Sequence, residues 1–532
     1  MMAHRGFSLA LCFSLVFLSA CAGGGGGNGI LPSGNGGGQT SLECPSSGSL
    51  PASIASSHSD AAGRIASPAR SAFVPGQIAI TLHRAAGAAR ASALTGLVHG
   101  DRAADLDFDA TGMQLRVINV APGTEDAALA TLRSQPGVVA AGRVGYRSRL
   151  SISANDPYYA GYPGTTAPYY ENASTPGQWD MHDINVSGAW NQVAANPPVV
   201  GSAAPIAVID TGVDVTHPEL SGGKIVRTRC FVSYPVGSAQ TTGQYVTDTD
   251  GHGTNIAGIA SADSNNSLGF VGTSYDAKLL AYRIFPTDPS TGCEGSNATN
   301  PQCQAYTGDE ASAINDAVAN GAKVISLSLG TDPGAGACSV ADPEYQAVEN
   351  AIAHNVTVVA AAGNGDQAGN AEAHLDCPAG DPGVIAVGAS GLNDANPLAI
   401  TEEIAPYSNY IVGSNGRYLL APGGNATSSS DLDDLHWIEG LYSSTALNSS
   451  QYCIPDLGAA SGAPNDCRLL FVGTSQATPH VSGVAAMILT VRPNYTPQQV
   501  ATALCNSAVD IGNLKEGCGR LDASAAVAYA LA

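Results

Sequence analysis

Short apolar runs that are typical of buried strands alternate with helical segments over the last two thirds of the chain. The runs Ile206 to Ile209, Val324 to Leu327, Val356 to Ala360 and Val384 to Val387 are nearly continuous, and helices are predicted over 309–320, 343–354 and 479–489. A strand that is apolar on both faces must be covered on both faces. The alternation therefore predicts an α/β domain over residues 155–532, with three layers and a mostly parallel sheet between helices.

The composition narrows the class of partner. Of 532 residues, 44% are apolar and only 12% are charged, against about 25% in an average globular protein, so a large core can be buried. The 44 acidic side chains outnumber the 22 basic ones, which gives a net charge of −22. Because affinity for phosphate backbones comes mainly from Lys and Arg, we expect no nucleic acid as a partner.

A different pattern occupies residues 73–150. Alternating apolar positions predict half-buried strands near 78–82, 113–117 and 138–146, and a helix near 127–134 that starts after Thr124 and ends at Pro136-Gly137. This order of elements fits a small α+β domain that precedes the large one.

The first 72 residues are predicted to serve export and tethering. The apolar run from Phe7 to Leu18 is too short to cross ~30 Å of hydrocarbon as a helix, so residues 1–20 are predicted to be a signal peptide. Leu18-Ser19-Ala20-Cys21 resembles the lipobox of bacterial lipoproteins, which implies a lipid anchor on Cys21, and the following Ala22 points to the outer membrane. The alternative is an ordinary signal peptide with a chance cysteine. Residues 21–72, rich in Gly and Ser, are predicted to be a flexible tether.

The twelve cysteines indicate an oxidising compartment. Without Cys12 of the signal and Cys21, ten remain, an even number suited to disulfides. The close pairs Cys293/Cys303, Cys453/Cys467 and Cys505/Cys518 are predicted to form local bridges. Zinc binding is the competing interpretation, but the sequence contains no Cys-x-x-Cys pair.

Three segments carry side chains whose chemistry fits together. Asp210 ends a predicted buried strand, His252 lies between two glycines, and Ser475 opens a predicted helix. Each alone has an ordinary explanation, as a strand-end cap, a loop histidine or a helix N-cap. Together they match an orienting carboxylate, a general base and a nucleophile, in the chain order Asp, His, Ser.

These segments resemble the signatures of subtilisin-like serine peptidases, and the resemblance covers about residues 155–532. Further matches are Gln178-Trp179, Ala189-Trp190, Ser328-Leu329-Gly330, Ala361-Ala362-Gly363-Asn364, Ile385 to Ala389 and Gly519 to Ala523. The resemblance implies that Asp210 orients His252, that His252 acts as base and then acid, and that Ser475 is the nucleophile. It also implies that Asn364 donates its amide to the oxyanion, and that residues 73–150 are an inhibitory, fold-assisting propeptide.

The same resemblance locates a specificity pocket for the residue before the scissile bond, P1. Its walls would be Ser328, Leu329 and Gly330 on one strand and Ala361, Ala362 and Gly363 on the other, with Asp376 near the floor. A carboxylate in a desolvated pocket gains most from a cationic partner, so we expect a preference for Arg or Lys at P1. The alternative is that Asp376 turns outward beside a disulfide of Cys377 and the pocket takes apolar residues.

The chain departs from the family pattern at two positions. Asn255 stands where a second histidine is common, and Gln476 follows the serine where methionine is usual. We interpret both as changes in packing or specificity, with loss of activity as the alternative. His480 is predicted to pack on the helix after Ser475. Calcium is common in the family, and Asp248 and Asp250 are acidic loop residues. Because solvent-facing acids are an equal explanation, no metal ligand is assigned.

The sequence as a whole predicts a secreted, lipid-anchored serine endopeptidase of the bacterial cell envelope, made as a preproprotein, that cleaves peptide bonds through an acyl-enzyme without an organic cofactor. Self-cleavage is expected between about Arg149 and Asn155, which could release the enzyme from the membrane. The rival hypothesis is a catalytically silent binding or adhesion lipoprotein on a peptidase fold. An α/β-hydrolase esterase is disfavoured because the segment Gly473 to Ala477 is not Gly-x-Ser-x-Gly.

Overall fold

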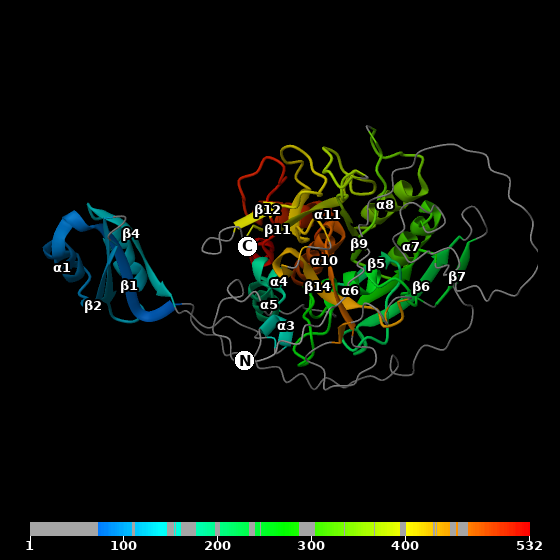
Figure 1. Cartoon of the computed structure of the whole chain (residues 1–532). Coiled ribbons are helices and arrows are strands. Elements are labelled where there is room, and N and C mark those ends of the chain that lie inside the picture. The colour runs from blue at the N-terminus through cyan, green and yellow to red at the C-terminus, as the bar shows by residue number, and fades with distance from the viewer. Residues whose placement is uncertain are drawn as a thin grey trace, which may run out of the picture. The chain divides into compact units, whose positions relative to one another are not determined.

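The structure is a computed structural model. It describes residues 73–532 with gaps at 109–111, 146–153, 155, 161–176, 197–202, 234–239, 245, 287–303, 335, 367, 394–400, 429–430, 432, 447–448, 450–453 and 456–466. The predicted signal peptide, tether, lipidated Cys21 and cleavage segment therefore lie outside the described residues. The chain divides into two compact units, one within residues 58–150 and one that includes residues 151–532 (Figure 1).

The smaller unit is an antiparallel sheet covered by two helices. Strands β1 (Phe73–His83), β2 (Asp101–Phe108), β3 (Met113–Asn119) and β4 (Val138–Gly145) take the order β2-β3-β1-β4. The buried positions of β1, Ile78, Ile80 and Leu82, pack with residues of α1 (Gly87–Leu97) and α2 (Glu125–Arg133). The three predicted strands and α2 are confirmed. The sequence analysis missed α1 and β2, because α1 is rich in alanine and β2 carries three aspartates.

A nine-stranded sheet forms the centre of the larger unit. Its order is β12-β11-β10-β9-β5-β8-β6-β7, and β13 pairs with β11. The strands are β5 (Ile206–Asp210), β6 (Ile225–Val232), β7 (Thr241–Gly243), β8 (Leu279–Arg283), β9 (Val324–Leu327), β10 (Thr357–Ala361), β11 (Ile385–Asn393), β12 (Thr401–Ile404) and β13 (Tyr418–Pro422). All pairings are parallel except those of β7 and β12 at the edges, which confirms the mostly parallel sheet.

Helices cover both faces of this sheet, and successive strand residues point to opposite faces (Figure 1). In β5, Ile206 and Val208 pack with α5 (Val186–Ala195), α6 (His252–Ser261), α10 (Thr474–Val491), α11 (Pro497–Ser507) and α12 (Ala523–Leu531). Ala207 and Ile209 of the same strand pack on the other face with α7 (Thr307–Ala319) and α8 (Pro343–Ala353). The three-layer α/β fold is thus confirmed. Helix α10 begins at Thr474, so Ser475 lies at a helix start as predicted, and the apolar run predicted from Pro479 is the continuation of the same helix.

Smaller elements and disulfides complete the unit. They are α3 (Pro157–Ala160), α4 (Trp179–Asp183), and a second sheet of β14 (Ile438–Tyr442), β15 (Ile454–Pro455) and β16 (Cys467–Phe471). The predicted Cys505–Cys518 bridge is confirmed, and Cys338 pairs with Cys377. Cys467 is disulfide-bonded, whereas Cys453 and the pair Cys293/Cys303 lie outside the described residues. Among the described residues, no helix is both long and apolar enough to cross a membrane.

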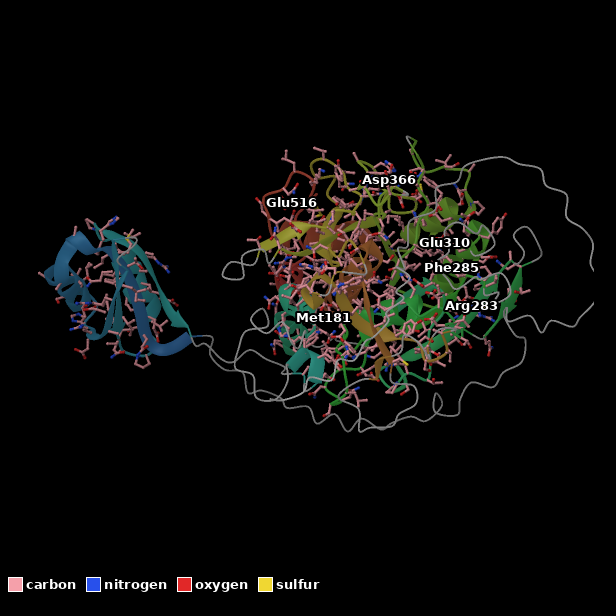
Figure 2. All side chains as sticks on the ribbon, viewed as in Figure 1. Met181, Arg283, Phe285, Glu310, Asp366 and Glu516 are labelled. Atoms are coloured by element: carbon pink, nitrogen blue, oxygen red, sulfur yellow. A yellow bond between two sulfur atoms is a disulfide. The ribbon has the colours of Figure 1, made fainter. Side chains whose placement is uncertain are left out.

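Three carboxyl groups are buried together where α7, α8 and the loop before β11 meet. They belong to Glu310, which Figure 2 labels on α7, Glu344 on α8, and Asp381. Burial raises the pKa of Glu344 to about 10, with further contributions from Glu310 and Asp381, and it raises the pKa of Glu310 to about 8. Such groups bind protons more tightly in the folded state than in the unfolded chain, so they favour folding at low pH and lose this contribution as pH rises.

We predict that Glu344→Gln raises the thermal midpoint and that the gain grows from pH 5 to pH 9. The amide keeps the shape of the side chain but cannot ionise. The wild type loses stability as pH rises from the ordinary pKa of 4.5 toward the raised pKa of Glu344, and the variant does not have this loss. Circular dichroism melts across this range measure the effect, with exposed Asp510→Asn, which lies outside this cluster, as the control. Parallel pH curves for wild type and Glu344→Gln would contradict the prediction.

Candidate active site

The sheet brings the separate sequence motifs to one edge. Asp210 is the last residue of β5, Ser328 follows β9, and Asn364 lies three residues beyond β10. These strands are neighbours and parallel, so their carboxyl ends meet at the same edge, where α/β sheets hold their ligands. His252 begins α6 and Ser475 is the second residue of α10.

The imidazole of His252 is joined to Asp210. Its Nδ1 lies 2.7 Å from Oδ1 of Asp210, and both side chains are buried. Burial by itself lowers the pKa of His252, but the Asp210 carboxylate, with smaller contributions from Asp250 and Asp248, raises it above its ordinary value. The other ring nitrogen, Nε2, has no hydrogen-bond partner. The ring is therefore held by its inner nitrogen and offers its outer nitrogen for proton transfer.

The hydroxyl of Ser475 is hydrogen-bonded to a backbone carbonyl and not to the imidazole of His252. Its Oγ donates to the carbonyl oxygen of Ser328 at 3.1 Å, and Ser328 Oγ donates back to the carbonyl oxygen of Ser475 at 2.8 Å. This reciprocal pair fixes the start of α10 to the end of β9. A direct bond between Ser475 Oγ and His252 Nε2 requires the hydroxyl to leave the Ser328 carbonyl.

Asp248 holds the histidine and aspartate segments together. Its fully buried carboxylate accepts bonds from the Thr211 hydroxyl, from the backbone N–H groups of Asp250 and Gly251, and from both N–H and hydroxyl of Thr254. Thr211 follows Asp210, and Thr254 lies in the first turn of α6, so one carboxylate ties the end of β5 to the helix that begins with His252. The sequence analysis weighed Asp248 as a calcium ligand or a solvent-facing acid, assigned no metal to it, and missed this role.

The calcium ligand considered at Asp248 does not fit the structure, because five hydrogen-bond donors already occupy its carboxylate. Both oxygens of Asp248 already accept hydrogen bonds from N–H and O–H donors, and Asp250 Oδ1 accepts the backbone N–H of His252. A hard cation needs oxygen lone pairs that face it. These two residues therefore act as hydrogen-bond acceptors within the loop.

Asn364 is oriented by the residue that precedes the serine. Its Oδ1 accepts bonds from the backbone N–H and the hydroxyl of Thr474, each at 2.8 Å. The amide nitrogen of Asn364 consequently lies toward Gly473, 3.5 Å from the point where a Cβ on that glycine would be. Asn364 and the N-terminal end of α10 therefore flank the same point beside Ser475.

The two departures from the family pattern contact each other. Gln476 Nε2 donates to Asn255 Oδ1 at 3.1 Å, and Asn255 Nδ2 donates to the Leu441 carbonyl at 3.3 Å. Both amides are buried, so each supplies the partner that the other needs. His480, one turn further along α10, is fully buried and bonded to Asp180, so its predicted packing role is confirmed.

The predicted pocket residues surround Asp376. A Cβ built on Gly363 would lie 2.5 Å from the Asp376 carboxyl carbon, and one on Gly330 would lie 3.1 Å from its Cβ. The carboxyl group is fully buried, Oδ1 accepts a bond from Asn409 Nδ2, and Oδ2 has no partner. Asp376 thus faces the two glycines of the predicted walls and does not turn outward, although Cys377 beside it is in a disulfide. Of the other predicted wall residues, Ala361, Ala362 and Ser328 are buried and Leu329 is partly buried.

A buried carboxylate–imidazole pair beside a helix-start serine, at the carboxyl edge of a parallel sheet, is an arrangement suited to nucleophilic acyl transfer. Comparison with known proteins assigns the family. The model of the subtilase family matches residues 201–521, and the chain belongs to this family.

The relatives are bacterial proteases. An extracellular protease of Xanthomonas campestris pv. campestris is 31% identical over 373 residues, which cover 65% of this chain and 54% of that protein. Fervidolysin of Fervidobacterium pennivorans is 30% identical over 361 residues, which cover 67% of this chain and 44% of that protein. The chain thus spans about half the length of these two relatives.

Solved structures agree on the fold. A protease of Pseudoalteromonas arctica matches with a TM-score of 0.51 and 25% identity, covering 71% of this chain and 99% of that chain. The crystal structure of fervidolysin matches with a TM-score of 0.50 and 24% identity, covering 86% of this chain and 61% of that chain.

We predict that kcat/KM falls on the acid side with a midpoint above the ordinary histidine pKa of about 6.5. His252 can accept a proton only when it is neutral, and the carboxylates around it raise its pKa. Asp250→Asn keeps an acceptor for the backbone N–H of His252 but removes one of these charges, so its midpoint should move to lower pH. Exposed Asp366→Asn is the control, and an unmoved midpoint in Asp250→Asn would contradict the electrostatic explanation.

Proposed function

We propose that this protein is a secreted serine endopeptidase that hydrolyses peptide bonds through an acyl-enzyme. The observation that carries the proposal is the buried bond between Asp210 and His252 Nδ1, which leaves Nε2 without a partner on the same sheet edge as Ser475. The membership in the subtilase family and the protease relatives support it. Proteins and peptides are the proposed substrates, and the chemistry needs no cofactor.

In the proposed mechanism, Ser475 Oγ attacks the scissile carbonyl carbon and passes its proton to His252 Nε2. Asp210 holds the imidazole in the required tautomer and stabilises the imidazolium. The Asn364 amide and backbone N–H groups at the start of α10 stabilise the oxyanion. His252 then gives its proton to the departing amine. Water, deprotonated by His252, releases the acyl group and restores the Ser475 hydroxyl.

The silent-lipoprotein alternative receives no comparable support. A binding protein would not need Asp210, His252, Asn364 and Ser475 in this arrangement, whereas a peptidase requires all four chemical roles. The two departures, Asn255 and Gln476, leave those four residues in place and satisfy each other by a hydrogen bond.

We further propose that residues 73–150 are a propeptide that inhibits the enzyme before cleavage near Arg149 to Asn155, and that Cys21 carries a lipid anchor in the cell envelope, on the outer membrane. The compact α+β unit supports the first proposal. The Leu18 to Cys21 motif supports the second. The extracellular protease of Xanthomonas, as its name states, supports export.

A fluorophosphonate probe should label the wild-type protein at Ser475, and Ser475→Ala should abolish the label. If the enzyme matures itself, the same variant should accumulate as uncut precursor in a host that lacks other peptidases. Fractionation of these cells then tests the anchor, because the precursor should remain with the membrane while the processed domain is free to leave it. Labelling that persists in Ser475→Ala would refute Ser475 as nucleophile, and normal processing of that variant would refute self-cleavage.

Asp376 is proposed to favour Arg or Lys at P1. Its burial between Gly330 and Gly363 and its unpartnered Oδ2 support a cationic ligand, because a buried charge gains most from a charged partner. Asp376→Ala should lower kcat/KM for P1 Arg relative to P1 Leu about tenfold or more, the usual scale for loss of one partner of a buried charge pair. Exposed Asp366→Ala is the matched control. A P1 profile unchanged by Asp376→Ala in a peptide library would remove the carboxylate from selection.

A further inference from the structure

We propose that Asp332, Glu372 and His374 form a site for a zinc-like divalent cation at the proposed P1 pocket, and that the bound cation competes with basic P1 side chains. The binding site rests on the geometry of these three residues and on the buried carboxylate of Asp376, whose Oδ2 has no hydrogen-bond partner among the described residues. The competition rests on the proposed function of Asp376.

The three side chains have the spacing of a metal site. His374 Nε2 lies 2.8 Å from Asp332 Oδ1 and 3.6 Å from Glu372 Oε2, and all three ligand atoms lie within 4.8 Å of one another. Zinc bonds of about 2.0–2.2 Å in a tetrahedron separate neighbouring ligand atoms by about 3.4 Å. The observed spacings lie on either side of this value, so small side-chain shifts suffice to bind the ion.

The backbone around these ligands is held in place. Asp332 Oδ1 accepts the backbone N–H of Gly334 at 2.6 Å, and the backbone N–H of Glu372 donates to Asn409 Oδ1 at 2.8 Å. The three ligand side chains are 20–28% exposed. An ion can therefore reach the site from solvent while its ligands stay positioned. One imidazole and two carboxylates form a donor set that zinc accepts readily, with the fourth position left for water.

The carboxyl group of Asp376, which lies next to these three ligands, independently favours a positive charge at this position. An antiparallel bridge pairs Thr331 with Cys377, so Asp332 and Asp376 are the next facing positions and share one side of the ladder. Asp376 is fully buried and its Oδ2 has no hydrogen-bond partner. Asn409 joins the two parts, because its amide donates to Asp376 and accepts from the backbone of Glu372.

The other metal-like group among the described residues does not compete with this one. It consists of Cys338, Cys377 and Asp381, but the two sulfurs are bonded to each other and offer no thiolate. The site at His374 is also distinct from the catalytic residues, since no bond joins any of its three ligands to Asp210, His252 or Ser475 among the contacts of the described residues.

The position of the site predicts its effect. Asp332 lies two residues after Gly330 of one predicted wall, and His374 lies two residues before Asp376 near the predicted floor. A bound cation would join both segments and place positive charge beside the carboxylate that is proposed to receive Arg or Lys. It should therefore weaken the binding of basic P1 side chains and leave the triad chemistry intact.

Direct binding is tested on full-length enzyme blocked at Ser475 by a sulfonyl fluoride, which prevents self-digestion. Calorimetry with zinc chloride should give one site per chain, and His374→Ala should weaken binding at least tenfold. His354→Ala, which removes an exposed histidine at the C-cap of α8, should bind zinc as wild type does. No binding to the wild type, or equal binding to the wild type and His374→Ala, would overturn the site. If no sulfonylation occurs, the untreated protein serves for the same titration.

The proposed consequence is tested by kinetics. Zinc should raise KM for a P1 Arg substrate several-fold with kcat little changed, leave a P1 Leu substrate unaffected, and lose this effect in His374→Ala. Equal inhibition of both substrates, or inhibition that persists in His374→Ala, would overturn the competition. The metal site and the P1 preference can fail independently in these experiments. Zinc binding with no P1 Arg preference in the wild type refutes only the role of Asp376, whereas the P1 preference without zinc binding refutes only the metal site.

Discussion

The carboxylate of Asp248 is the interaction on which the candidate active site most depends. This carboxylate is buried and contacts no cationic side chain among the described residues. Burial raises its pKa, yet five N–H and O–H donors favour its charged form. Those donors come from the end of β5 and from the start of α6. Because Asp210 and His252 lie at these two ends, their 2.7 Å contact follows from the way the two segments are joined. The close approach also needs Gly253, where a Cβ would lie 2.1 Å from the carbonyl oxygen of Gly212.

The position of Asp376 in the predicted pocket depends instead on two neighbouring residues that have no side chain. Gly330 and Gly363 leave the space that the carboxylate occupies, and any larger residue at Gly363 would displace it. Gly363 also has φ +108°, a backbone conformation that favours glycine. The backbone of the two wall segments therefore both admits Asp376 and hides it from water. Acidic groups at Asp332 and Glu372 add to the negative charge around Asp376, whereas His374 and the hydrogen bond from Asn409 act in the opposite direction.

The sequence predicted a functional residue correctly where a short segment determines both its secondary structure and its position in the sheet. The strand that ends at Asp210 is apolar on both faces, which indicates a central parallel strand, and the carboxyl edge of such a strand is where a functional aspartate is expected. It failed where the decisive partner is distant in the chain. The Cys338–Cys377 bridge spans 39 residues, and the donors of Asp248 depend on how a loop folds over β5. Helix α1 was missed because its alanine-rich sequence has no distinct apolar face.

The pairing of Asn255 with Gln476 bears on whether the departures from the family pattern weaken the site. A buried amide without a partner is costly, so either residue alone would disturb the space between α6 and α10. Together they form a bond between the helix that begins with His252 and the helix that carries Ser475. The second contact of Asn255, to the carbonyl of Leu441, extends this link to β14. Two residues that satisfy each other beside the proposed triad are compatible with a working site, whereas decay of a silent site would leave no reason for the second residue to match the first.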